Sequence, residues 1–362
     1  MGFKKNKVKA DLCSYPPFIF LAPKKFGKTT FWYNLVPYVW GDDDKGLLIS
    51  FSNEEGYHAL DGLQYEVAKD WNADYDEETG LRGFVQIVDD IVENNDDYGI
   101  KGVCFDTLDT MIDVATKEVL RQHRKEKGTV CKSLLDAFSG YGRGKQRLLK
   151  ICNEQIDRLR SAGIAVFILC HIKNKEKTDL KSGEKYEMIT NNLTEDIFSN
   201  FGDAAQMVMT GAFDRQIENG KLISENRAIY LRGDLTVDAG GRFKNLPEKI
   251  NLDVKEFMDA FENAVKSSMR DKADSKTIEK MKAEEQKEMK KKADIAKKKD
   301  KEFNEDRNEE LLNKIKENMA DLEDAEVKKK ILEIIKSSGA KNLSDMINYP
   351  THYLEDIYSI FA

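Results

Sequence analysis

Short apolar runs separated by amphipathic stretches fill the first two-thirds of the chain. Several runs have the length and composition of buried strands, at 17–22, 47–51, 100–106, 163–170, 205–209 and 226–232. Helical spacing of apolar residues predicts helices at 30–39, 110–124, 146–162 and 253–265. The run 84–88 predicts another short strand, followed by an acidic helix at 89–97. Strands that alternate with helices predict an α/β fold with a mainly parallel central sheet.

The last third of the chain has a different composition. Between Glu248 and Ser338 there is neither Gly nor Pro, and Lys, Glu, Asp and Ala dominate the middle of this stretch. Such a composition favours a solvent-exposed helix or a charged linker. Apolar residues at helical spacing resume in the tail. We therefore predict three parts: an α/β domain at 1–265, a charged helical linker at 266–318 and a small helical C-terminal module at 319–362.

The strand predicted at 17–22 leads into a short loop and then a helix that opens with Gly-Lys-Thr-Thr. A helix N-terminus directs backbone N–H groups and a positive dipole at one point, which suits a phosphate chain. The spacing matches the P-loop pattern G-x-x-x-x-G-K-[ST], with Ala22 in place of the first glycine, a replacement that requires a negative φ. Lys28 would reach the β and γ phosphates, and the hydroxyl of Thr29 would ligate Mg²⁺. The predicted nucleotide-binding residues are Ala22, Pro23, Lys24, Lys25, Phe26, Gly27, Lys28, Thr29 and Thr30.

Carboxylates follow two of the predicted strands, at the edge where open α/β sheets bind ligands. Asp106 ends the strand at 100–106 and fits the second Mg²⁺ contact of P-loop enzymes, which usually acts through a metal-bound water. Glu54 and Glu55 follow the strand at 47–51, which we expect next to the P-loop strand. Either could polarise the water that attacks the γ-phosphate, or both could be solvated turn residues.

A histidine follows the most strand-like run of the chain. His171 comes directly after 163–170, which we expect beside the strand that ends at Asp106. A polar side chain at that point would contact the γ-phosphate and report its loss to the following loop. A lone histidine is more often a structural group, so this role depends on the other motifs.

Two polar segments are basic and are predicted to be loops. The segment 139–145 interleaves glycines with Tyr141, Arg143 and Lys145, and a stackable ring among positive charges suits single-stranded nucleic acid. A mobile surface loop that binds nothing is an equally good interpretation of these residues. The segment 173–192 begins with Lys173, Lys175 and Lys177, and a loop of this length in a compact domain is usually functional or disordered.

Charge and cysteine content narrow the classes to which this protein can belong. Over 362 residues, 34% are charged and the net charge is −7, which argues against a general nucleic-acid coat while leaving local basic loops possible. The five cysteines are scattered and lack a C-x-x-C pair, as expected for reduced core thiols. No apolar run approaches membrane-spanning length. We therefore expect a cytoplasmic protein that does not contact a membrane.

Together these motifs resemble the RecA-like ATPases of phages, the AAA-type nucleotide-binding proteins related to phage single-strand annealing recombinases. The resemblance covers about Val8 to Val265 and is specific as a set of motifs in one order. It departs from the family pattern at Ala22 and in a longer spacing before Glu54. The segments that carry it are 22–30, 48–51, 54–60, 103–107, 140–145, 167–177, 230–233 and 239–244.

The resemblance implies a RecA-like P-loop NTPase core that binds ATP and Mg²⁺ at the carboxyl ends of parallel strands. It implies that Lys28 and Thr29 hold the phosphates and Mg²⁺, that Asp106 is the second metal contact, that Glu54 is the catalytic base and that His171 is the γ-phosphate sensor. In RecA-like proteins two loops line the single strand, and here they match the two basic segments. Basic residues that complete a neighbour's ATP site across a ring or filament interface match Arg232, Arg242 and Lys244.

These observations lead to one main hypothesis and two alternatives. We expect a DNA-stimulated ATPase that acts on single-stranded DNA in phage recombination, annealing or replication, as a homo-oligomer in the host cytoplasm. One alternative is a nucleotide-gated loader or scaffold whose C-terminal tail recruits a partner such as a single-strand DNA-binding protein. The other is a small-molecule P-loop kinase. Stimulation of ATP turnover by DNA separates the first hypothesis from the kinase.

Overall fold

The computed structural model describes most of the N-terminal part of the chain and portions of the C-terminal part. The described residues are 17–51, 56–73, 76, 81–268, 284, 287, 291, 308–319, 322, 325–338, 340–348 and 351–361. The chain divides into two compact units, Met1–Lys290 and Lys291–Ala362.

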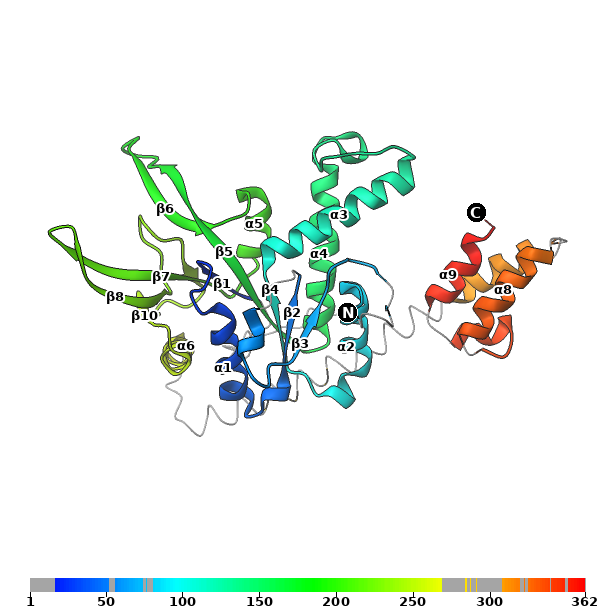
Figure 1. The fold of residues 1–362 in the computed structure, drawn as a ribbon, viewed down its shortest axis with the longest axis horizontal. Helices are drawn as coiled ribbons and strands as arrows, with labels where there is room; N and C mark the ends of the chain where they lie inside the picture. Colours follow the sequence, from blue (N-terminus) through cyan, green and yellow to red (C-terminus); the bar gives the residue numbers. More distant parts are fainter. Residues whose placement is uncertain are drawn as a thin grey trace, which may run out of the picture. The chain divides into compact units, whose positions relative to one another are not determined.

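The first unit is built on a ten-stranded sheet (Figure 1). Along the main path the strand order is β10-β8-β7-β1-β5-β4-β2-β3, while β6 pairs with β5 and β9 with β7. The six strands from β7 to β3 along this path are all parallel, and the remaining pairs are antiparallel. The strands are β1 (Phe18–Ala22), β2 (Gly46–Ser50), β3 (Tyr65–Val67), β4 (Gly102–Asp106), β5 (Ala165–Thr178), β6 (Lys185–Asn191), β7 (Met207–Glu218), β8 (Lys221–Tyr230), β9 (Gly240–Gly241) and β10 (Lys249–Asn251).

Helices cover both faces of the sheet. Those of the first unit are α1 (Lys28–Trp40), α2 (Phe84–Tyr98), α3 (Leu108–Lys127), α4 (Arg143–Ser161), α5 (Glu195–Gly202) and α6 (Val254–Ser268), with short 3-10 turns η1 (Asp43–Lys45), η2 (Gly56–Ala59) and η3 (Ala137–Ser139). The strands alternate with helices as the sequence pattern requires. The structure therefore confirms the predicted α/β fold with a mainly parallel central sheet.

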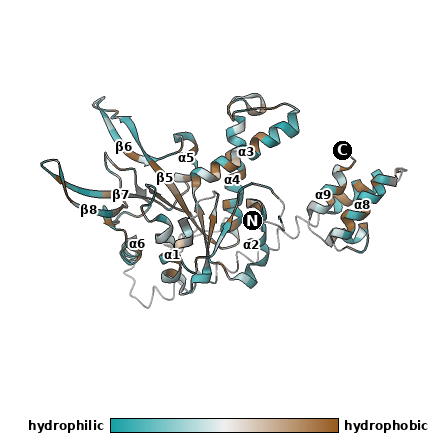
Figure 2. Ribbon diagram, viewed as in Figure 1, coloured by the Kyte–Doolittle hydropathy of each residue, from teal (hydrophilic) through white to brown (hydrophobic). Residues whose placement is uncertain are grey.

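The alternation of side chains along β1 separates two hydrophobic layers. Ile19 and Leu21 point to one face, where α2, α3, α4 and α5 bury their apolar residues. Phe18 and Phe20 point to the other face, against α1 and α6. Every residue of β1 is buried, as expected for a strand between two layers of helices. Figure 2 shows the apolar colour concentrated in the middle of this sheet and the hydrophilic colour on the outer segments.

Some sequence predictions about secondary structure are wrong. Residues 84–88 form the first turns of α2 and not a strand, because a short apolar run fits either structure until its packing is known. Arg143 and Lys145 lie in the first turn of α4 and not in a loop. The strand β2 pairs with β4 and β3 and not with the P-loop strand, from which β5 and β4 separate it.

The largest difference concerns the basic segment 173–192, which was predicted to be a loop. The strand β5 continues through it to Thr178, and β6 returns antiparallel from Lys185 to Asn191. Most side chains of the segment 173–191 are polar, including the buried Thr190 and Asn191 at the end of β6, so its strands lack the apolar periodicity that sequence patterns detect. A second long hairpin is formed by β7 and β8, and both extend beyond the body of the sheet (Figure 1).

The second unit contains its own apolar cluster, which includes Ile315, Ile331, Met346, Leu354 and Ile357. Its elements are a helical stretch at 308–319, α8 (Ala325–Ser337), η4 (Leu343–Asn348) and α9 (Thr351–Ser359). Residues 308–318, which the sequence assigned to the charged linker, contribute to this cluster. The domain boundaries drawn from sequence remain a prediction.

Among the described cysteines, Cys104, Cys131, Cys152 and Cys170 are free, and all except Cys131 are buried. Burial raises the pKa of the Cys152 and Cys170 thiols, which keeps them neutral and unreactive. Cys13 lies outside the described residues. No helix in the described part of the chain is both long enough and apolar enough to cross a membrane.

The loop that follows β1 is anchored by an aromatic ring. Phe26 is fully buried, and its ring centroid lies 5.4 Å from that of Phe213 on β7 and 6.2 Å from that of Phe20. The ring occupies the space beside Gly211, where a Cβ atom would lie 2.4 Å from Cε1 of Phe26. A glycine in β7 is therefore required for the loop to dock on this strand.

We predict that Gly211→Ala destabilises the protein by about 1–3 kcal/mol, because the added methyl group overlaps the Phe26 ring. Chemical denaturation of the full chain measures this change. Gly240→Ala is the matched control, since a Cβ at Gly240 meets no atom within 4 Å. Equal stability of the two variants would show that the ring is free to move aside.

Candidate nucleotide-binding site

The P-loop connects the carboxyl end of β1 to the N-terminus of α1. Gly27 is the N-cap of α1 with φ +108°, a conformation that glycine adopts without strain, and Lys25 also has a positive φ of +59°. Ala22 ends β1, is fully buried and has a negative φ. The condition under which alanine can replace the first P-loop glycine is therefore met.

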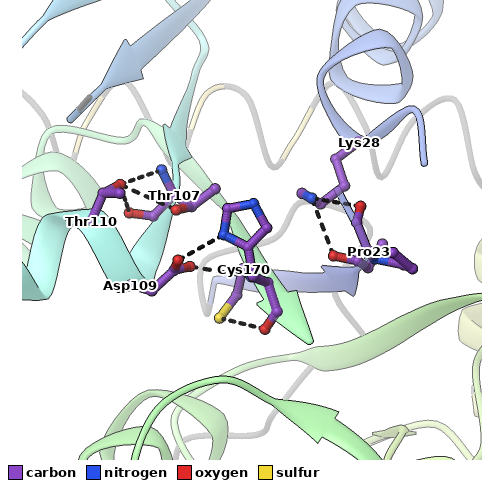
Figure 3. A network of polar contacts seen from close by, with 8 residues as sticks. Pro23, Lys28, Thr107, Asp109, Thr110 and Cys170 are labelled. Carbon is purple, nitrogen blue, oxygen red and sulfur yellow. Dashed lines mark hydrogen bonds and ion pairs between the residues drawn. The ribbon is translucent and has the colours of Figure 1, made fainter. Parts of the chain in front are cut away.

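Lys28 is the first residue of α1 and is only 7% exposed. Its Nζ donates hydrogen bonds to the carbonyl oxygens of Ala22 (3.1 Å) and Pro23 (3.0 Å), so the side chain folds back over the loop (Figure 3). Both acceptors lie at the start of the loop that ends at the N-terminus of α1, so the ammonium group is held over this loop. An anion at this point would meet the ammonium group and the helix dipole together.

Two further residues that the sequence assigned to Mg²⁺ lie in contact. The Thr29 hydroxyl donates a 2.9 Å hydrogen bond to Oδ2 of Asp106, which ends β4. A hydroxyl and a carboxylate are hard oxygen ligands, the type that Mg²⁺ prefers together with phosphate oxygens and water. The described residues hold no cluster of three or more His, Cys, Asp or Glu side chains suited to a metal. The residues present therefore fit a Mg²⁺ ion that a nucleotide's phosphates help to hold, with Thr29 and Asp106 as the protein's contribution.

The strand β5 lies between the P-loop strand and the Asp106 strand. Ala22 pairs with His171 in β1 and β5, and Asp106 pairs with Leu169 in β4 and β5. His171 is therefore beside the start of the P-loop, at the same sheet edge as Asp106. The prediction that this strand neighbours β4 agrees with the sheet order.

The His171 ring is held by an aspartate that sequence analysis did not identify. Nδ1 of His171 lies 2.7 Å from Oδ2 of Asp109, and the His171 backbone N–H donates to Oδ1 of the same carboxylate. A carboxylate only accepts hydrogen bonds, so Nδ1 carries the proton. Nε2 then remains to meet a ligand, since it contacts no polar partner among the described residues. Asp109 lies in the first turn of α3, after Asp106, and an acidic residue at this helix position was the available sequence signal.

Burial raises the pKa of Asp109, but its hydrogen bonds with His171 outweigh burial and bring the pKa down to about 2. Both side chains are largely shielded, with exposed fractions of 15% for Asp109 and 12% for His171. The aspartate is therefore charged throughout the physiological range and fixes the orientation of the ring.

The proposed catalytic base cannot be placed. Glu54 and Glu55 lie outside the described residues, which resume at Gly56 after Phe51. The preceding strand does reach the site, because Ser50 of β2 pairs with Asp106. The assignment of Glu54 or Glu55 as base stays a prediction.

Some of the residues predicted to bind DNA are exposed, and others already contact residues of their own chain. The Tyr141 ring is 96% exposed on a backbone with φ +53°, within a run of positive φ angles from Phe138 to Gly142. Arg143 and Lys173 are also exposed. Lys175 instead donates a 2.6 Å hydrogen bond to the carbonyl oxygen of Leu193.

Two more of the predicted DNA-binding lysines contact adjacent acidic residues at the start of α5. Lys177 of β5 pairs with Glu195 at 2.9 Å, and Lys145 of α4 pairs with Asp196 at 2.6 Å. The Lys145 hydrogen bond brings the pKa of Asp196 down to about 2. Helix α5 thus supplies negative charge to lysines from two separate elements.

The predicted interface residues also differ in their surroundings. Arg232 and Lys244 are exposed. Arg242 donates hydrogen bonds to the backbone carbonyl oxygens of Ala205 (3.1 Å) and Asp203 (2.8 Å) of its own chain. Together with Lys175 and Lys177 it lines a cavity of about 460 Å³ between the β5–β6 hairpin, α5 and β9. The structure therefore brings residues predicted for DNA and for an interface to the same cavity.

We predict that Asp109→Asn lowers the free energy of unfolding more at neutral pH than at pH 2. The folded-state pKa is below the ordinary value of 3.8, so the carboxylate contributes stability above about pH 4 that is lost as the pH falls toward 2. This lowering of the pKa corresponds to about 2 kcal/mol in the free energy of unfolding. Denaturation of parent and variant at several pH values between 2 and 7 measures it. A difference in stability that stays constant across this range would contradict the assignment.

The chain is similar to a solved structure and matches the model of a protein family. Among solved structures, the flagellar accessory protein FlaH from Methanocaldococcus jannaschii is similar, with 9% sequence identity and a TM-score of 0.30 over 60% of this chain and 78% of FlaH. A search of curated proteins gave no match. The model of a family described as AAA domain matches residues 16–243, which include the P-loop, Asp106 and His171. The chain therefore belongs to the AAA domain family and carries an AAA-type P-loop ATPase domain.

Proposed function

We propose that the protein binds and hydrolyses ATP and uses the nucleotide state to control its hold on single-stranded DNA, in recombination, annealing or replication. The observation that carries this proposal is the continuity of β5. His171 ends the part of β5 that lies between β1 and β4, and the same strand continues into the basic hairpin with Lys173, Lys175 and Lys177. At about 3.3 Å per residue, Lys177 lies about 20 Å along the strand from His171.

A continuous strand is suited to transmit a change between these two places. A hydrogen-bonded strand is stiffer than a loop, so a shift of the His171 backbone moves the base of the hairpin with it. On binding ATP, Lys28 exchanges its contacts with Ala22 and Pro23 for phosphate oxygens. His171, with its Nδ1–H directed at Asp109, donates from Nε2–H to the terminal phosphate when the ring carries a proton on both nitrogens. Loss of that phosphate removes the contact and leaves the hairpin in a different arrangement.

The remaining roles belong to residues that the sequence identified. A bound Mg²⁺ ion would supply positive charge that stabilises the phosphate oxygens. Thr29 and Asp106 would hold this ion, and Glu54, with Glu55 as the alternative, would orient and deprotonate the attacking water. Tyr141, Arg143 and Lys173 are exposed for base stacking and phosphate contacts.

We predict that single-stranded DNA increases the ATP turnover of the parent protein. We also predict that Lys28→Ala weakens ATP binding by at least about 30-fold, equivalent to about 2 kcal/mol. Calorimetry measures the affinity, and phosphate release with and without DNA measures turnover. Lys221→Ala at the start of β8 is a control that removes one positive charge outside the P-loop. Unchanged ATP affinity in Lys28→Ala would refute the P-loop assignment, and turnover that ignores DNA would refute the DNA role.

We also predict that the double variant Glu195→Gln, Asp196→Asn binds single-stranded DNA about two- to thirtyfold more tightly. Exposed ion pairs are worth about 0.2–1 kcal/mol each, and DNA phosphates must displace these two carboxylates to reach Lys145 and Lys177. The matched control is Asp214→Asn, Glu225→Gln, which removes two carboxylates paired with Lys249 and Arg215 at the other hairpin. Equal affinity for DNA in both double variants would place the DNA path away from α5.

A further inference from the structure

The β7–β8 hairpin presents one face to the P-loop. Phe213 of β7 packs its ring on Phe26 of the loop. Phe213 pairs with Arg227 across the two antiparallel strands. Directly opposite residues of an antiparallel pair lie on the same face of the sheet. Arg227 therefore lies on the face of the hairpin that meets the P-loop.

The guanidinium group of Arg227 lies beside the N-cap of α1. A Cβ atom built on Gly27 would lie 3.5 Å from Nη1 of Arg227, and 3.2 Å from Cδ2 of Leu252. The backbone N–H of Leu252 donates to the carbonyl oxygen of Arg227, so this part of β8 is held where it faces Gly27. Gly27 precedes Lys28, so one basic residue begins α1 and the other, from β8, lies beside the N-cap of this helix.

Arg227 differs from the other basic residues of the same surface. Arg215 pairs with Glu225 at 2.6 Å, and Lys249 pairs with Asp214 at 2.6 Å. Arg227 is exposed and makes no side-chain hydrogen bond or ion pair with any residue that the structure describes. Its guanidinium group therefore presents a positive charge and five N–H donors beside the P-loop. An anion is the partner that such a site lacks.

We propose that Arg227 binds a phosphate group of the nucleotide held by the P-loop, in the same chain as Lys28. This inference rests on the proposed nucleotide-binding function and adds a residue that no motif marks. The planar guanidinium can contact two oxygens of a phosphate, while the ammonium group of Lys28 acts as a point charge. The contact also joins the bound nucleotide directly to the β7–β8 hairpin.

A comparison of ligands with different numbers of phosphates distinguishes phosphate binding from a general effect of charge. Displacement of a fluorescent ATP analogue by ATP, ADP and adenosine measures the three affinities for the full-length parent and for Arg227→Ala. We expect ATP affinity to fall at least about tenfold in Arg227→Ala, because a charge-assisted hydrogen bond is lost, while adenosine affinity stays unchanged. Lys221→Ala is the matched control, since it removes one positive charge from the far end of the same strand and is expected to leave all three affinities as in the parent.

Two companion variants make the result decisive. Arg227→Lys keeps the charge and should recover part of the lost ATP affinity, whereas Arg227→Gln should not. Thermal denaturation without nucleotide checks that each variant is folded, and Arg227→Lys provides the comparison if the alanine variant is not. ATP affinity within twofold of the parent in Arg227→Ala, or an equal loss for adenosine and ATP, would overturn the inference.

The outcome for Lys28→Ala separates the two proposals. If Lys28→Ala loses ATP affinity and Arg227→Ala does not, the P-loop function stands and the role of Arg227 is wrong. If neither variant loses ATP affinity, the nucleotide site itself is wrong, and the inference about Arg227 is overturned with it.

Discussion

The hydrogen bond from Thr29 to Asp106 joins two parts of the chain that are 77 residues apart. It forms because β5 separates β1 from β4 by one strand and keeps all three parallel, so that their carboxyl ends reach the same edge. The P-loop lysine, the His171–Asp109 pair and the candidate Mg²⁺ contacts all depend on this alignment. A different strand order would leave the same motifs in the sequence and no common site in space.

The two long hairpins begin at the edge where the nucleotide is expected. One is formed by β6 and the part of β5 beyond His171. The other is formed by β8 and β7, which pairs with the P-loop strand. Phe26 packs against β7 beside Gly211, and Arg227 of β8 lies close to Gly27, so the second hairpin meets two adjacent residues of the loop. The P-loop strand β1 thus lies between β5 and β7, the strands from which the two hairpins extend, and each hairpin has its own proposed contact with the nucleotide.

The sequence predicted the parts of this arrangement that depend on local patterns. Apolar runs identified β1, β2, β4 and β5, and the P-loop spacing and the aspartate after β4 predicted residues that prove to be neighbours. The β5–β6 hairpin was missed because polar residues lie on both of its faces, so that backbone pairing and not an apolar pattern defines its strands. Asp109 and Arg227 were missed for a related reason, since each gains its significance from a contact across the fold and not from its neighbours in the chain.

The acidic start of α5 has a consequence for how binding would respond to ionic strength. When a polyanion is bound by free cationic side chains, the counterions condensed on it are released, and affinity falls steeply with added salt. Lys145 and Lys177 already have carboxylate partners, and Glu195 and Asp196 would take up cations from solution once those partners leave. In the proposed complex with single-stranded DNA, uptake of ions at α5 would offset part of the counterion release. The complex would therefore be less sensitive to salt than its number of lysine contacts suggests.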